Sequence, residues 1–122
     1  MSKDSRIDAL DAELKDFVRG HIHGWSHDHW GGLLAGLAER GHDVSDQDLI
    51  GLRLERAHIL ATLERLELKG VGAKRRERLA DHFPTLWKLR HAEVEELAAV
   101  PTFHRSLAEA LHAALTRRTG GF

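Results

Sequence analysis

Apolar residues recur through most of this chain at intervals of three and four positions, which places them on one face of an α-helix. The pattern is clear in residues 1–20, where acidic side chains occupy much of the opposite face. Its apolar members are Ile7, Leu10, Leu14, Phe17 and Val18. We therefore expect residues 1–20 to form an amphipathic helix that Asp4 or Ser5 caps and Gly20 ends.

Two further helices are expected in the first half of the chain. Ser26 is a typical N-cap for a helix that continues to about Arg40. Ser45 is expected to begin the next helix, with Asp48 completing an Asp variant of the capping box. The apolar pattern then continues toward the middle of the chain, and it fits both one long helix and a helix with a kink near residues 57–58.

The second half contains four shorter helical patterns, over residues 75–82, 85–91, 93–99 and 106–118. The predicted fold class is therefore all-α. We expect an N-terminal extension of about three helices over residues 1–58, a helical domain over residues 59–118 and a flexible tail over residues 119–122. Because no proline- or serine-rich linker occurs, the extension is expected to pack on the rest.

A tight turn, Lys69-Gly70-Val71-Gly72, lies between two of the helical patterns, with leucines before it and basic residues after it. Glycine tolerates positive φ and lets another backbone come close. The helix after the turn offers unpaired N–H groups and the positive end of its dipole, which suit a phosphate group. The sequence therefore predicts a hairpin that docks a phosphate.

Charge is distributed unevenly along the chain, although the whole has a net charge of only −1. Residues 1–58 carry 7 basic and 11 acidic residues, a net charge of −4. Residues 59–122 carry 11 basic and 8 acidic residues, a net charge of +3. Because affinity for phosphates follows local cations, the neutral total does not exclude nucleic-acid binding.

The composition excludes several kinds of site. The chain contains no cysteine, so disulfides, thiolate metal sites and thiol nucleophiles are absent. Its apolar runs are shorter than the ~20 residues that span a bilayer, and no charged-then-apolar leader opens it. We expect a cytoplasmic protein with no membrane partner and no cofactor.

The segment LKGVGAKRRERLADHF resembles the first hairpin of a tandem helix-hairpin-helix domain. Such domains occur in the C-terminal part of the excision nuclease UvrC and in related repair and recombination proteins. Each hairpin of the family has the form apolar-x-Gly-apolar-Gly, and a connector helix joins the two. The segments EVEELAAVP and RSLAEALHAAL are similar to the second hairpin, except that Thr102 and His104 replace its glycines. The resemblance covers residues 59–118.

The resemblance implies that backbone N–H groups of the first hairpin contact phosphate oxygens across a minor groove, with nearby cations adding charge. The candidate DNA contacts are Lys69, Gly70, Val71, Gly72, Lys74, Arg75, Arg76, Thr102, His104 and Arg105. In the second hairpin, Thr102 offers a hydroxyl and His104 a pH-dependent cation, but non-glycine residues make positive φ costly. We expect a strong first hairpin, a weak or structural second hairpin, and core positions for the tip residues Val71 and Phe103.

The segment HIHGWSHDHW, residues 21–30, contains the candidate metal ligands His21, His23, His27 and His29. The usual helical site places two histidines four residues apart on one helix with a base between them. His23 and His27 have that spacing, but a helix start at Ser26 separates them. Capping and packing against Trp25 and Trp30 explain these histidines equally well, so no metal site is predicted.

Three functions are compared. The favoured one is a non-sequence-specific DNA-binding protein that contacts phosphates of double-stranded or structured DNA, in DNA repair, recombination or DNA organisation. The alternative is a protein-interaction or homodimerisation module of the same fold with little DNA affinity, which fits the acidic first half and the three Trp. An enzyme that uses the histidine segment is least favoured, because the chain lacks a second carboxylate near it and a Gly-rich nucleotide loop.

Overall fold

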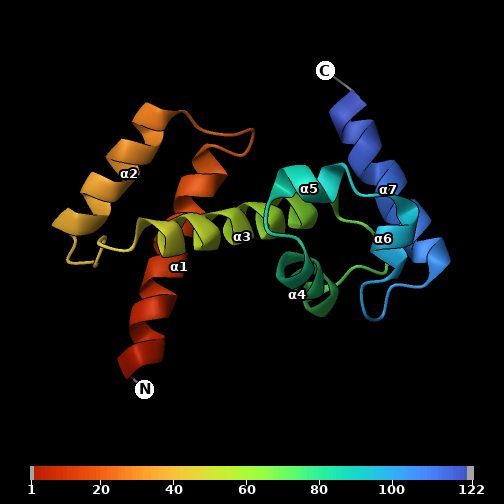
Figure 1. Cartoon of the computed structure of the whole chain (residues 1–122), viewed down its shortest axis with the longest axis horizontal. Helices are drawn as coiled ribbons and strands as arrows, with labels where there is room; N and C mark the ends of the chain where they lie inside the picture. The colour runs from red at the N-terminus through yellow and green to blue at the C-terminus, as the bar shows by residue number, and fades with distance from the viewer. Residues whose placement is uncertain (1, 121–122) are drawn as a thin grey trace.

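The computed structural model describes the backbone of residues 2–120 and the side chains of residues 8–117. Over that backbone it contains seven α-helices and no strand, so the fold is all-α, as the sequence predicts. The helices are α1 (Ser2–Gly20), α2 (His27–Glu39), α3 (Gln47–Leu66), α4 (Ala73–His82), α5 (Leu86–Arg90), α6 (Val94–Ala98) and α7 (Arg105–Gly120). In Figure 1, α1 and α2 lie at one end of α3, and α4 to α7 gather at the other.

The first group of helices packs around a small apolar core between α1, α2 and the first half of α3. The predicted stripe of α1 faces this core, since Leu14 and Val18 have no exposed surface. Outside the core, Arg53 of α3 donates hydrogen bonds of 2.8 and 2.5 Å to the carboxylate of Asp11 on α1. The crossing of α1 and α3 is therefore held by apolar packing and a two-pronged ion pair.

The start of α3 differs by one residue from the prediction. Asp46, and not Ser45, is the N-cap, because its side chain accepts a 3.1 Å hydrogen bond from the N–H of Leu49. Ser45 instead donates through its N–H and hydroxyl to the carboxylate of Asp43. The predicted cap between Ser45 and Asp48 is wrong, since a neighbouring aspartate reaches the first free N–H groups of the helix.

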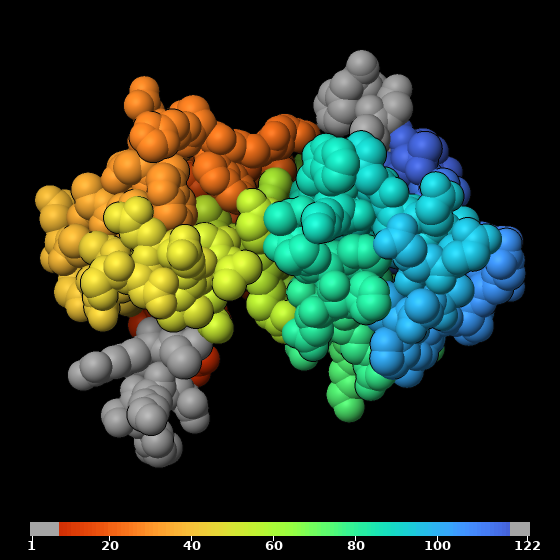
Figure 2. All heavy atoms as spheres, viewed as in Figure 1, coloured from red at the N-terminus to blue at the C-terminus, as the bar shows by residue number. Residues whose placement is uncertain are grey.

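One continuous helix α3 connects the two groups, so the long helix is confirmed and the kink is not. Ile50 and Leu54 belong to the first core, whereas Ile59 and Leu63 belong to the second. The position between residues 58 and 59, where the sequence suggests a division, lies inside α3. Figure 2 shows two neighbouring lobes with α3 visible between them.

The second core lies between the end of α3 and the helices α4 to α7. Its most deeply buried members, at most 1% exposed, are Ile59, Leu79, Leu89, Leu97, Val100, Ala108 and Leu111. The short helix α5 connects two hairpins, α3–α4 and α6–α7, and Thr85 caps it by accepting a 3.1 Å hydrogen bond from Lys88 N–H. The tip residues Val71 and Phe103 are only 6% and 4% exposed, which confirms their predicted core positions.

The ends of the helices depart from the prediction in small ways. The helix α4 begins two residues early, at Ala73, and α7 runs to Gly120, where the sequence suggests a loose tail from residue 119. The side chains of Asp4, Ser5, Ile7 and Arg118 lie outside the described residues, as do residues 121–122 entirely. Within the described part of the chain, no helix has the length and apolar character needed to cross a membrane.

Candidate nucleic-acid interface

The first hairpin is built by an unusual end of α3 followed by a tight turn. Glu67, the C-cap of α3, adopts a left-handed conformation with φ of 50°, and its N–H donates to Glu64 O at 3.3 Å. The turn then closes through a 3.1 Å hydrogen bond from Val71 N–H to Leu68 O. Gly70 has φ of 91° within this turn. The chain therefore reverses in a few residues and enters α4 directly.

The two glycines of the turn have different roles. Gly70 has positive φ, and a Cβ there would lie 3.2 Å from Leu107 Cδ1 of α7, so a side chain at this position would be strained. Gly72 has φ of −85°, which any residue can adopt, and a Cβ there would meet nothing within 4 Å. The space beside Gly72 is thus open to an outside group.

The N–H groups of the hairpin are also used differently from one another. Val71 does not offer the N–H that the family resemblance implies, because that group already donates to Leu68 O. Gly72 is the N-cap of α4 and provides no side-chain cap. The first N–H groups of α4, at Ala73, Lys74 and Arg75, therefore lack an acceptor among the described residues and point out of the helix start. Together with the helix dipole they favour an anion.

The cations around the hairpin divide into two pairs. Lys69 and Lys74 are exposed and make no hydrogen bond or ion pair within the described residues. Arg75 instead donates to Gly70 O at 2.7 Å and to Thr102 O at 3.2 Å. Arg76 donates to Val71 O at 3.3 Å. The lysines are available to a ligand, whereas the arginines hold carbonyls of the hairpins.

The second hairpin repeats the backbone of the first without its glycines. Phe103 N–H donates to Val100 O at 3.0 Å, as Val71 does to Leu68. Thr102 takes the place of Gly70 and has φ of 71°. Positive φ is costly for a residue with a side chain, yet Thr102 adopts it here. The two hairpins therefore have equivalent turns.

In the second hairpin, side chains occupy the helix start and pair with the nearby cation, unlike in the first hairpin. The imidazole Nδ1 of His104 accepts a 3.2 Å hydrogen bond from Leu107 N–H and so caps α7. One ring nitrogen of His104, which the sequence suggests as a pH-dependent cation, is therefore engaged within the protein. Arg105 lies 3.5 Å from Glu95 and 3.3 Å from Glu109 in two ion pairs. Both ion pairs are exposed, so they offset its charge only in part.

The histidine segment is used for capping and packing. His29 and Ser26 form a reciprocal capping box at the start of α2, each N–H lying 3.2 Å from the other side chain. His21 stacks on Phe17 at 4.2 Å between ring centroids, and Trp25 lies 4.9 Å from the ring of His58. Among the described residues, no group of three or more potential ligands could hold a metal ion.

Comparisons with known proteins find similarity to UvrABC system protein C of several bacteria. UvrABC system protein C of Aliivibrio fischeri is 43% identical over 80 residues, which are 65% of this chain and 13% of that protein. The Proteus mirabilis protein of the same name is 42% identical over 80 residues, again 65% of this chain and 13% of the relative. The Saccharopolyspora erythraea protein is 47% identical over 53 residues, 43% of this chain and 7% of the relative. This chain resembles part of UvrC.

The similarity confirms the resemblance drawn from the hairpin motif and extends it. A match of 80 residues in a chain of 122 must include residues 43–80, so it covers α3 as well as the first hairpin. The chain spans about 13% of the length of these UvrC relatives. No family model matches the chain, and no solved structure matches it.

Proposed function

We propose that this chain binds DNA through phosphate groups at the first hairpin, without reading the base sequence. The observation that carries the proposal is an open helix start beside two unpaired lysines. No described atom lies within 4 Å of the position that a Cβ on Gly72 would take, and Lys69 and Lys74, which flank Gly72 in the sequence, are exposed. Backbone N–H groups, a helix dipole and point charges all favour phosphate and none of them distinguishes bases.

Two further observations support a role in DNA repair, recombination or DNA organisation. The relatives are proteins of the UvrABC system, and the similar segment includes the first hairpin. The chain also has no asparagine and only one glutamine, Gln47, which lies away from the hairpin. Side chains that commonly read adenine are thus absent from the interface, as expected for binding to the DNA backbone. Double-stranded or structured DNA in the cytoplasm is the proposed ligand.

The proposal is tested by reversing the two free charges. We expect the Lys69→Glu/Lys74→Glu variant to lose most of its affinity for a fluorescent duplex, measured by anisotropy across a salt series. Wild-type affinity is expected to be roughly micromolar at physiological salt, and each phosphate contact contributes about 0.9 to the salt slope. The matched control, Lys15→Glu/Lys88→Glu, changes net charge equally at two exposed lysines outside the hairpin. Equal losses in both variants would contradict a site at the hairpin.

A second variant tests the open space itself. Gly72→Ala adds one methyl group where no protein atom lies within 4 Å, so it is expected to leave the free energy of unfolding within about 0.5 kcal/mol of wild type. The same methyl group would stand in front of the α4 N–H groups and reduce DNA affinity severalfold. Unchanged affinity would show that phosphate does not approach at Gly72.

One observation favours a second candidate, a homodimer or another protein partner. Leu49 and Leu52 of α3 are 48% and 60% exposed, and Trp87 of α5 is 66% exposed. Exposed large apolar residues are typical of contact surfaces. However, residues 1–58 leave Gly70, Gly72 and Lys74 exposed, which favours the DNA proposal. Sedimentation equilibrium of wild type and Leu52→Glu distinguishes the two, since a dimer formed through this surface would dissociate in the variant.

A further inference from the structure

A groove follows the solvent side of α3 where the two lobes meet. It consists of two open hollows of about 430 and 560 Å³, and both are lined by Leu52 of α3 and by Pro84, between α4 and α5. One hollow reaches the end of α4 at Asp81 and His82, and the other reaches Trp30 of α2. In Figure 2 the yellow surface of α3 lies next to the teal surface of the second lobe at this groove.

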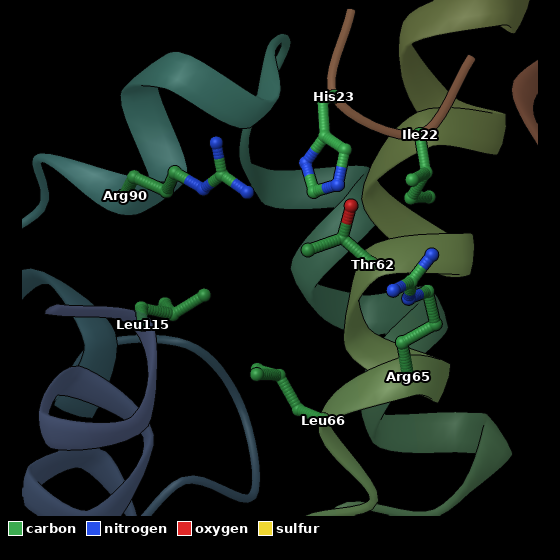
Figure 3. Close-up of a pocket in the computed structure, with 7 residues that line it drawn as sticks. All are labelled: Ile22, His23, Thr62, Arg65, Leu66, Arg90 and Leu115. Atoms are coloured by element: carbon green, nitrogen blue, oxygen red, sulfur yellow. The ribbon is translucent and has the colours of Figure 1, made fainter. Parts of the chain in front are cut away.

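A smaller cavity lies between the loop after α1 and the helices α3, α5 and α7, and its unpaired polar atoms are out of reach. Its volume is about 60 Å³. Figure 3 shows the Thr62 hydroxyl and the Arg90 guanidinium at this cavity, but Thr62 Oγ1 and Arg90 Nε each have less than 1 Å² of accessible surface. Of the two spaces, the groove along α3 is therefore the one that an outside group can enter.

Apolar side chains lie exposed along the groove. Leu49 and Leu52, about one turn apart on α3, are 48% and 60% exposed, and Pro84 is also exposed. The opposite side of α3 buries Ile50 and Leu54 in the first core. A helix that is apolar on two sides is normally covered on both, and clustered exposed apolar residues mark contact surfaces. This side of α3 therefore has the character of an interface.

The charged side chains of the groove that have no partner are both negative. Asp48 and Glu55 line it, and neither makes a hydrogen bond or an ion pair with a described residue. They lie four residues before and three residues after Leu52, so the three side chains follow one side of α3. The arginines of the groove already contact carboxylates, in the pairs Arg53–Asp11 and Arg56–Asp81. The groove therefore favours a partner with positive charge beside apolar side chains, and it disfavours phosphate.

We propose that this groove binds an amphipathic helix of another protein, whose apolar residues pack on Leu49 and Leu52 and whose Lys or Arg side chains pair with Asp48 and Glu55. The two carboxylates are about 10 Å apart along α3, so cations two turns apart on a partner helix reach both. A second copy fits less well, because a symmetric contact brings the same acidic pair from both sides. The proposal rests on the protein-contact function considered above and is independent of DNA binding at the first hairpin.

The first test is NMR of the full chain titrated with a designed peptide of roughly four helical turns. Its leucines recur at intervals of three and four residues, and lysines flank them. One reference peptide has glutamate in place of each lysine, and another has the residues of the lysine peptide in shuffled order. The amides of residues 47–56 are expected to shift with the lysine peptide alone. No shift at millimolar peptide, shifts only elsewhere, or equal shifts with either reference peptide would overturn the proposal.

Two variants test the separate contacts, with circular dichroism to check that each is folded. Leu52→Ala removes an exposed side chain, so the fold should persist and the affinity for the lysine peptide should fall about tenfold. Asp48→Asn/Glu55→Gln is expected to weaken binding several-fold and to flatten its salt dependence. The matched control, Asp16→Asn/Glu39→Gln, removes the same charges at two exposed positions outside the groove and should bind like wild type. Wild-type affinity in both groove variants would contradict the proposal.

Two further measurements distinguish the partner helix from other occupants. In sedimentation the chain alone is expected to be a monomer, whereas a dimer that Leu52→Ala dissociates would assign the groove to a second copy and overturn the proposal. A DNA duplex should leave the amides of residues 47–56 unmoved, and a shift there would assign the groove to nucleic acid instead. The Lys69→Glu/Lys74→Glu variant should bind the lysine peptide as wild type does, so that a failure of the hairpin proposal is recognised separately.

Discussion

The two hairpins of this protein have the same backbone turn but differ in the groups that surround it. Each closes with one hydrogen bond across its tip, from Val71 to Leu68 or from Phe103 to Val100, and each has a residue with positive φ. The first then opens onto an uncapped helix start with free lysines. In the second, a histidine caps the helix and carboxylates compensate the arginine. The shared turn geometry therefore does not by itself make the surroundings of the two turns alike.

The two hairpins are also joined to one another. Arg75, which follows the first turn, donates to a carbonyl in each hairpin, at Gly70 and at Thr102. Leu107 of α7 lies where a Cβ on Gly70 would contact it. The closed second hairpin thus supports the position of the open first one. Its departure from the family motif is consistent with a structural role.

The largest expected effect comes from the position that couples the two turns. Gly70→Ala requires a side chain at φ of 91° and places its Cβ 3.2 Å from Leu107 Cδ1. We expect a loss of roughly 1–3 kcal/mol in the free energy of unfolding, measured by urea denaturation. Thr102→Gly is the matched change in the second turn and removes a strained residue, so it should cost little or stabilise. Equal losses at both positions would show that the turns are not equivalent.

Next in size is the effect of removing the bridge between the hairpins. Arg75→Lys keeps the charge but not the two-pronged geometry, and we expect it to destabilise the fold by about 1–2 kcal/mol. DNA affinity should stay near wild type at temperatures where the variant is folded, because its charge is retained. Anisotropy and denaturation on the same samples separate the two effects. A loss of affinity without a loss of stability would assign Arg75 to the DNA contact instead.

A smaller change is expected when the second hairpin is made to resemble the first. Thr102→Gly/His104→Gly places glycines at both positions of the family motif. It also removes the acceptor of the hydrogen bond that Leu107 N–H donates to His104. Losing the cap should cost about 1 kcal/mol, partly offset by the relief at residue 102. DNA affinity should rise a few-fold, with a steeper salt slope. No gain in affinity would mean that Glu95 and Glu109, and not the missing glycines, keep this hairpin from binding.

The smallest expected effect is a dependence of stability on pH caused by His58. It determines the pH range in which the hairpin variants should be compared. Burial lowers the pKa of His58 in the folded protein, although a 2.7 Å hydrogen bond to Ile22 O and the charge of Glu55 oppose it. The unfolded chain therefore binds a proton more readily, and stability should fall as the pH decreases below about 6.5. Above that pH the contribution is constant. Denaturation at several pH values should show a smaller dependence in His58→Gln, and an unchanged dependence would assign it to other groups.

Much of the fold can be predicted from the sequence because its signals are local. The 3.6-residue period, the cap at Ser26 and the Phe83-Pro84 break each act within a few residues, and the helices they predict are present. The glycine turn likewise locates the first hairpin and its similarity to UvrC. Where local signals compete, as between Ser45 and Asp46, the prediction is wrong by one residue, since either side chain suits an N-cap.

The sequence by itself thus determined the helices, the all-α class and the position of the open hairpin. Only the tertiary structure decided which N–H groups and side chains of the hairpins are free to contact a ligand. Arg75 donates to Thr102 O, and the N–H of Val71 is already bonded to Leu68 O. Of the two glycines in the turn, only Gly70 has a positive φ. The tertiary structure also brings Leu52 and Pro84 to one groove. These outcomes depend on contacts between residues far apart in the chain, and helical periodicity carries no information about such contacts.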